Sequence, residues 1–83
     1  MKLDVRERLL EDSGFKKKWL SDKSGYWWEK KINKRVKFYA DTKVKKKRYY
    51  FDIKGDEPGE YATIYINSFS SFIMESNSFK FNY

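Results

Sequence analysis

The 83-residue chain contains no cysteine, no histidine and only one proline. Without cysteine it cannot form disulfides, thiolate nucleophiles or cysteine metal sites. Without histidine it lacks the usual general base and the commonest transition-metal ligand. Only carboxylates, lysine and tyrosine remain for chemistry, so we expect a protein that is not an enzyme and that holds neither a cofactor nor a metal.

Long apolar runs are also missing. The first six residues are of mixed charge with no apolar stretch behind them, so we expect no secretory signal. The longest uncharged stretch, residues 61–74, is interrupted by polar side chains and is shorter than the roughly 20 apolar residues that a membrane-spanning helix needs. We therefore expect no membrane partner and, in the absence of disulfides, a cytoplasmic location.

The length of the chain limits its organisation. A chain of this size buries only about 60% of its unfolded surface and has no material for a second core. Aromatic residues make up 20% of the sequence, and each buried ring removes a large apolar area from water. We expect one domain over residues 1–83.

Positive charge is concentrated in the middle of the sequence. Residues 15–54 carry 13 Lys and 2 Arg against 4 acidic residues, whereas both flanking segments are slightly acidic and the whole chain carries +7. Nine aromatic residues are interspersed among these cations before Phe51. Cations follow phosphates and rings stack on bases, so this composition is typical of polyanion-binding surfaces. Lysine outnumbers arginine 15 to 4, which weakens the case for specific base reading.

The N-terminal segment predicts a helix over residues 4–13. Asp4 suits the N-cap and Glu7 the N3 position of a variant capping box. Gly14 suits the left-handed position that ends a helix, and Leu10 and Phe15 are then spaced for the contact that accompanies a Schellman motif.

After Phe15 the period changes to two residues, which predicts strands separated by turn residues. The expected strands cover residues 15–20, 26–32, 35–41, 48–54 and 61–66. Residues 57–60 fit a type II turn, with Pro58 at its second position and Gly59 at its third.

The loop after Ile32 fixes the register of the sheet. A three-residue loop over 33–35 aligns Ile32 with Val36 and keeps the apolar residues of both strands on one face. This register also places Lys30 on the apolar face, where its ammonium group has to extend out past the core.

A second helix is expected near the C-terminus. Asn67 or Ser68 can cap it, and Phe69, Phe72 and Ile73 have helical spacing. The last residues alternate again and fit either a final strand or a loosely packed end. The fold class is therefore α+β, with an N-terminal helix, an antiparallel meander of about five strands and a short C-terminal helix.

The outward face of the sheet is the strongest candidate for a binding site. Rings flanked by cations on a sheet can stack single-stranded nucleic acid, and the alternative is that the C-terminal helix covers this face and uses the rings for packing. The candidate residues on this face are Trp27, Lys31, Lys37, Tyr39, Arg48 and Tyr50.

Two runs of cations are further candidates. Lys45, Lys46 and Lys47 fall in a loop, where all of them and Arg48 can contact one polyanion, although a solvated loop explains them as well. Residues 16–18 fall in a strand, where successive side chains point to opposite faces, and a charged edge that resists aggregation is the better explanation.

Catalysis has a weak candidate. Asp41 and the Asp52, Ile53, Lys54 triplet have the acid and acid-x-lysine pattern by which metal-dependent nucleases hold Mg²⁺. The same pattern begins at Glu29 by chance, so we do not expect a nuclease.

Two functional classes follow from these observations. The first is a non-catalytic protein whose basic, aromatic-rich central segment binds nucleic acid or a nucleic-acid-loaded complex. The second is an inhibitor from a phage or mobile element that binds a host defence protein, such as a nuclease, at an acidic or nucleic-acid-binding groove. Size and composition suit small viral or mobile-element accessory proteins, and the first class is the favoured one.

Overall fold

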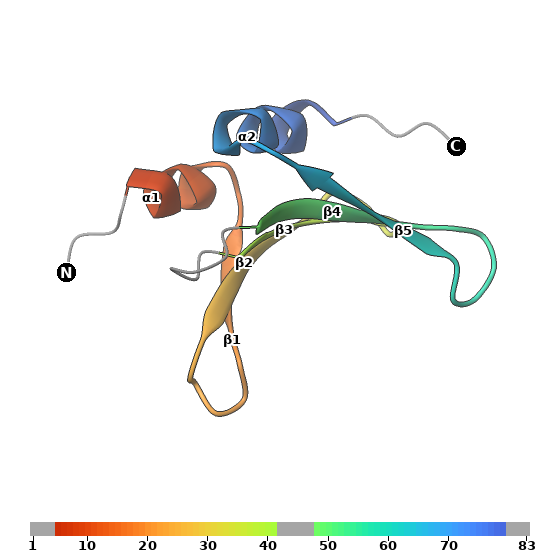
Figure 1. Cartoon of the computed structure of the whole chain (residues 1–83), viewed down its shortest axis with the longest axis horizontal. Helices are drawn as coiled ribbons and strands as arrows, with labels where there is room; N and C mark the ends of the chain where they lie inside the picture. Colours follow the sequence, from red (N-terminus) through yellow and green to blue (C-terminus); the bar gives the residue numbers. More distant parts are fainter. Residues whose placement is uncertain (1–4, 42–47, 80–83) are drawn as a thin grey trace.

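The strands follow one another through the sheet in the order in which they occur in the sequence. The computed structural model describes residues 5–41 and 48–79, and there the chain forms one antiparallel sheet of order β1-β2-β3-β4-β5, with one helix before it and one helix after it in the sequence (Figure 1). This arrangement confirms the α+β class and the expected meander. The elements are α1 (Val5–Asp12), β1 (Lys16–Trp19), β2 (Tyr26–Lys31), β3 (Val36–Asp41), β4 (Arg48–Lys54), β5 (Tyr61–Ile66) and α2 (Phe69–Ser78).

Helix α1 ends in the predicted Schellman motif. Gly14 has a φ of +91°, the amide of Phe15 donates to the carbonyl of Leu10 at 2.9 Å, and the amide of Gly14 donates to the carbonyl of Glu11 at 3.1 Å. Leu10 and Phe15 are both buried, so the helix end is tied to the core. The predicted N-cap Asp4 lies outside the described residues.

The predicted register of β2 and β3 is confirmed. Trp28 is the cross-strand partner of Ala40, and the amide of Ile32 donates to the carbonyl of Val36 at 2.9 Å. The side-chain oxygen of Asn33 accepts hydrogen bonds from the amides of Arg35 and Val36, which holds the loop closed.

The turn after β4 and the cap of α2 also match their predictions. Gly59 has a φ of +84°, and the amide of Glu60 donates to the carbonyl of Glu57 at 3.1 Å. Ser68 caps α2 by accepting from the amide of Ser71. Phe79 packs its ring against two core phenylalanines, and the rest of the tail, expected as either a final strand or a loosely packed end, lies outside the described residues.

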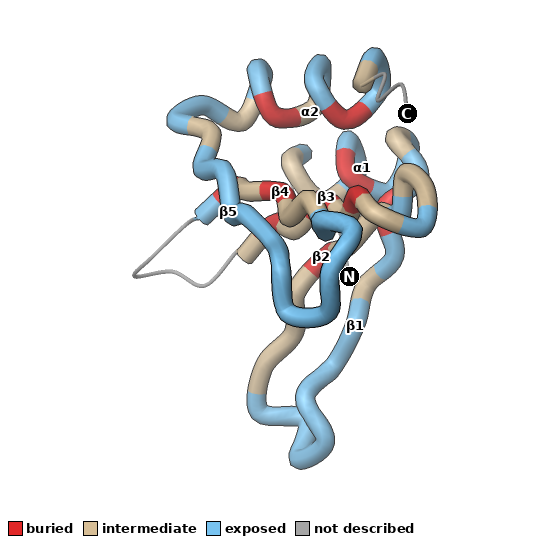
Figure 2. Tube along the Cα trace, turned by 90° about the vertical axis from the view of Figure 1, so that its right-hand side faces the viewer, coloured by how far each residue is buried: buried red, intermediate tan, exposed pale blue. Residues whose placement is uncertain are grey.

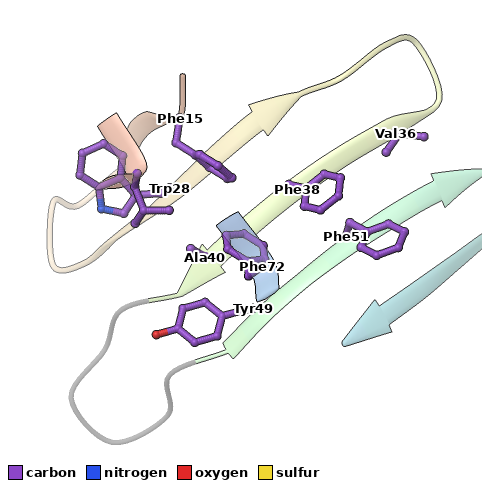
Figure 3. Packing of buried hydrophobic residues seen from close by; sticks show 9 residues of the cluster. Phe15, Trp28, Val36, Phe38, Ala40, Tyr49, Phe51 and Phe72 are labelled. Carbon is purple, nitrogen blue, oxygen red and sulfur yellow. The ribbon is translucent and has the colours of Figure 1, made fainter. Parts of the chain in front are cut away.

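Both helices lie on the same side of the sheet, and the core lies between them and the strands. Figure 2 shows the buried positions gathered on α1, α2 and the inner strands. The ring of Phe72, on α2, lies 5.7 Å from that of Phe38 and 5.3 Å from that of Tyr49, as Figure 3 illustrates. Helix α2 therefore packs on the apolar face, and the alternative in which it covers Trp27, Tyr39 and Tyr50 is wrong.

Candidate functional site

The side of the sheet away from both helices is called the open face. Because side chains alternate along a strand, this face takes every second residue of each strand, and the cross-strand partners identify which ones. Its residues are Lys16 and Lys18 of β1, Trp27, Glu29 and Lys31 of β2, Lys37, Tyr39 and Asp41 of β3, Arg48, Tyr50, Asp52 and Lys54 of β4, and Tyr61, Thr63 and Tyr65 of β5.

A row of tyrosines crosses the middle of the open face. Tyr39, Tyr50 and Tyr65 are direct cross-strand partners on β3, β4 and β5. The rings of Tyr39 and Tyr50 are stacked with centroids 5.1 Å apart, and the ring of Tyr65 is tilted against Tyr50 at 5.5 Å. The ring of Tyr50 therefore lies between two other rings. The ring faces of Tyr39 and Tyr65 that point away from Tyr50 form the two ends of the row.

The hydroxyl groups of Tyr39 and Tyr50 remain protonated to higher pH than usual. Burial raises the pKa of Tyr39, and the nearby carboxylates Asp52 and Glu29 raise it further. Burial also raises the pKa of Tyr50, with Asp52 adding to the effect. Because a protonated phenol donates a hydrogen bond, both side chains present donors to an anionic ligand at neutral pH.

The three carboxylates of the open face are each engaged by a neighbour. Glu29 accepts from the indole nitrogen of Trp27 at 3.3 Å and lies 3.9 Å from the ammonium of Lys18. Asp41 lies 3.8 Å from the guanidinium of Arg48. Asp52 accepts from the hydroxyl of Thr63 at 2.7 Å. The charges of Glu29 and Asp41 are therefore partly neutralised within the face, and Asp52 is hydrogen-bonded there.

The cations of the open face are in excess and less engaged. Six of its residues are Lys or Arg, against three carboxylates. Within the described part of the chain, no carboxylate lies at ion-pair distance from Lys31, Lys37 or Lys54. These three ammonium groups lie on adjacent strands and are available to an external anion.

Two hollows are lined mainly by cations, and the first of them borders the tyrosine row at Tyr39. One, of about 320 Å³, is lined by Lys34, Arg35, Lys37, Tyr39, Asp52, Lys54 and Tyr61. The other, of about 390 Å³, is lined by Gly14, Lys16, Lys18, Glu29, Lys30, Lys31 and Lys37. Lys37 lines both hollows. A smaller hollow of about 200 Å³ lies on the other side of the row, between Trp27, Tyr39 and Tyr50.

The structure brings most of the predicted site residues onto this one face. Trp27, Lys31, Lys37, Tyr39, Arg48 and Tyr50 all belong to it, whereas Lys45, Lys46 and Lys47 lie outside the described residues. The sequence prediction missed Tyr61, Tyr65 and Lys54. The alternation of side chains along a strand could have found them, because the apolar residues 62, 64 and 66 of one expected strand and 49, 51 and 53 of the other leave residues 61 and 65 and residue 54 to face outward.

The carboxylates considered for a nuclease site do not come together. Asp41 is the cross-strand partner of Arg48 and Asp52 is the cross-strand partner of Lys37, and the Tyr39–Tyr50 partners lie between these two positions. Asp41 and Asp52 are therefore offset by four residues along the strands, roughly 13 Å, and this separation is too long for both carboxylates to coordinate one metal ion. Within residues 5–41 and 48–79, no group of three acidic side chains could hold a metal.

No protein-family model matches the chain, and comparison with curated proteins and with solved structures finds no match either. In the described part of the chain, neither helix is long and apolar enough to cross a membrane. The chemistry of the open face is therefore argued from its own side chains.

Proposed function

We propose that this protein is a non-catalytic binding protein whose open face engages nucleic acid or a nucleic-acid-loaded complex. One observation carries the proposal: a sheet face that neither helix covers combines a tyrosine row with an excess of cations, of which Lys31, Lys37 and Lys54 have no carboxylate partner among the described residues. Phosphates supply the counter-charge that these ammonium groups lack.

The geometry favours contacts with the backbone of the nucleic acid. Lys31 and Lys37 are cross-strand partners, so their ammonium groups can hold neighbouring phosphates. The hydroxyls of Tyr39 and Tyr50 add hydrogen-bond donors beside them. Because these two rings stack on one another, a base can stack only at the ends of the row or in the hollow beside Trp27. Affinity that depends on phosphates and little on base sequence is expected from this arrangement.

The test is a fluorescence-polarisation titration of the full chain with single-stranded and duplex oligonucleotides across a range of salt concentrations. We expect binding at low salt that weakens linearly on a plot of log K against log salt. Tyr39→Ala should weaken binding to the single strand by about 1 to 3 kcal/mol, the contribution of one stacked ring. Absence of binding to either oligonucleotide at low salt would refute the proposal.

A protein target is the second candidate, and the exposed aromatics support it. Tyr61 and Tyr65 are largely exposed on the open face, and tyrosine and arginine are enriched in protein interfaces. An inhibitor of a host defence nuclease would place this face on an acidic or nucleic-acid-binding groove of its target. Failure to bind any oligonucleotide, together with inhibition of such a nuclease, would favour this candidate.

A further inference from the structure

The outer edge of β5 differs from the other edge of the sheet. β5 contains six residues, none of them charged and none of them proline or glycine. Figure 2 shows it exposed along almost its whole length, and Tyr61, Ile64 and Tyr65 are 68%, 42% and 60% exposed. The opposite edge, β1, carries Lys16, Lys17 and Lys18. Charged edge strands resist pairing, whereas an uncharged, exposed edge invites it.

The backbone of β5 has hydrogen-bonding groups directed away from the sheet. The amide of Gly55 donates to the carbonyl of Glu60 at 2.8 Å, so Glu60 bonds toward β4. In an antiparallel ladder the bonding direction alternates along the strand, which directs the amides and carbonyls of Tyr61, Thr63 and Tyr65 outward. Among the described residues none pairs with this edge, because β5 is the last strand of the sheet.

We propose that a second copy of this chain pairs with β5 in antiparallel orientation, about a two-fold axis at Thr63. In this register Thr63 faces its own counterpart and Tyr61 faces Tyr65 of the second copy. Every outward amide and carbonyl of the three residues then has a partner. On the other face, Ala62 lies opposite Ile64 of the second copy, which covers the exposed Ile64 side chain.

The side chains are compatible with this self-pairing. Each chain carries a net charge of +7, yet no cation meets a cation within the paired strands because β5 has none. The turn that precedes β5 is exposed and acidic, with Asp56, Glu57 and Glu60, which lowers the positive charge close to the paired strands.

The paired sheets would form one continuous open face with two tyrosine rows. This inference rests on the edge of β5 alone and does not depend on the proposed function. Self-association and oligonucleotide binding can therefore succeed or fail independently.

A cysteine at the two-fold axis tests the register. The chain has no cysteine, so Thr63→Cys introduces a single thiol. Directly bonded partners in an antiparallel pair have Cα atoms about 5.5 Å apart, within the range that a disulfide spans. Tyr61→Cys is the control. Because position 61 faces position 65 of the second copy, the two introduced thiols then lie four residues apart along the paired strands, roughly 13 Å. Mild oxidation should convert Thr63→Cys to a disulfide dimer in high yield while Tyr61→Cys remains mostly reduced. Equal cross-linking of the two variants, or none of either, would overturn the proposal.

Variants with opposite charges at position 63 provide an independent measurement of self-association. Analytical ultracentrifugation of the wild type should show a concentration-dependent increase from 10.2 kDa toward twice that mass. Thr63→Lys and Thr63→Glu should each remain monomeric, because like charges would then face one another, and an equimolar mixture should restore the dimer. Thermal melts monitor folding of each variant. A wild type that remains monomeric at all concentrations, or a mixture that does not associate, contradicts the inference.

Discussion

The ammonium of Lys30 donates a hydrogen bond to the carbonyl oxygen of Ser76 at 3.1 Å, which ties the sheet to the end of α2. The same ammonium donates to the side-chain oxygen of Asn77 at 3.0 Å. Helix α2 has no basic residue in its last turn, so this lysine from β2 supplies the cation that a helix C-terminus favours. Its stem crosses the apolar face, and burial lowers the pKa of its ammonium group.

Lys30→Met should therefore destabilise the fold by about 1 kcal/mol, since the apolar stem is kept while the hydrogen bonds to the helix end are removed. The neighbouring Lys31→Met is the matched control, because that exposed side chain lies on the open face and should change stability by less than about 0.5 kcal/mol. Urea denaturation measures both. A Lys30→Met variant as stable as the control would show that the contact contributes nothing.

Gly14→Ala should destabilise the fold by about 1 kcal/mol, because a residue with a side chain is strained at the positive φ that ends α1. A Cβ at this position would meet only the Cε of Lys30 at 3.6 Å, an ordinary contact, so the strain lies in the backbone. Gly14→Asn should recover part of the loss, because asparagine tolerates the left-handed region. An unchanged or raised melting temperature for Gly14→Ala would contradict this explanation.

Phe38→Ala and Tyr39→Ala compare the two faces of β3. Phe38 is fully buried and contacts the rings of Phe51, Phe72 and Phe79, so its truncation should cost about 3 to 5 kcal/mol and can unfold a domain of this size. Tyr39→Ala should cost about 1 kcal/mol, the contribution of its stack on Tyr50. Equally severe destabilisation by both variants in thermal melts would mean that both faces of the sheet are buried.

The raised pKa values of Tyr39 and Tyr50 predict a pH dependence of stability. The folded state holds these phenolic protons more tightly than the unfolded state, whose tyrosines titrate near pH 10. The resulting stabilisation is fully present below pH 10 and is lost as the pH rises through the folded-state pKa values. Denaturation at increasing alkaline pH should therefore show the wild type losing stability relative to Tyr39→Phe/Tyr50→Phe. A constant difference between the two proteins would contradict the assignment.

Local signals in the sequence were sufficient for most of the fold. The positive φ of Gly14 and Gly59 and the loop held by Asn33 each depend on residues within a few positions of one another, so their conformations could be predicted. The partner of Lys30 could not be predicted, because Ser76 is 46 residues away and its position depends on how α2 packs.

The candidate site was predictable in composition but not in geometry. Alternation places Trp27, Tyr39 and Tyr50 on one face, and sequence alone could not decide whether α2 covers that face. The stacking of Tyr39 on Tyr50 also depends on rotamers of side chains from two strands. This stacking shifts the expected contacts from base faces toward phosphates.

The central claim is that the open face binds nucleic acid, and the salt dependence of two charge-matched double variants tests it most directly. Lys31→Gln/Lys37→Gln removes two cations from the open face. Lys17→Gln/Lys23→Gln removes the same charge elsewhere, because Lys17 lies on the other face of β1 over the rings of Trp19 and Tyr26, and Lys23 lies in the following turn. Binding of each variant to a labelled single-stranded oligonucleotide is measured across salt concentrations. The first variant should flatten the slope of log K against log salt by up to roughly 0.7 to 0.9 for each phosphate that the protein no longer neutralises. The second variant should keep the wild-type slope. Equal slopes for the two variants would contradict the claim.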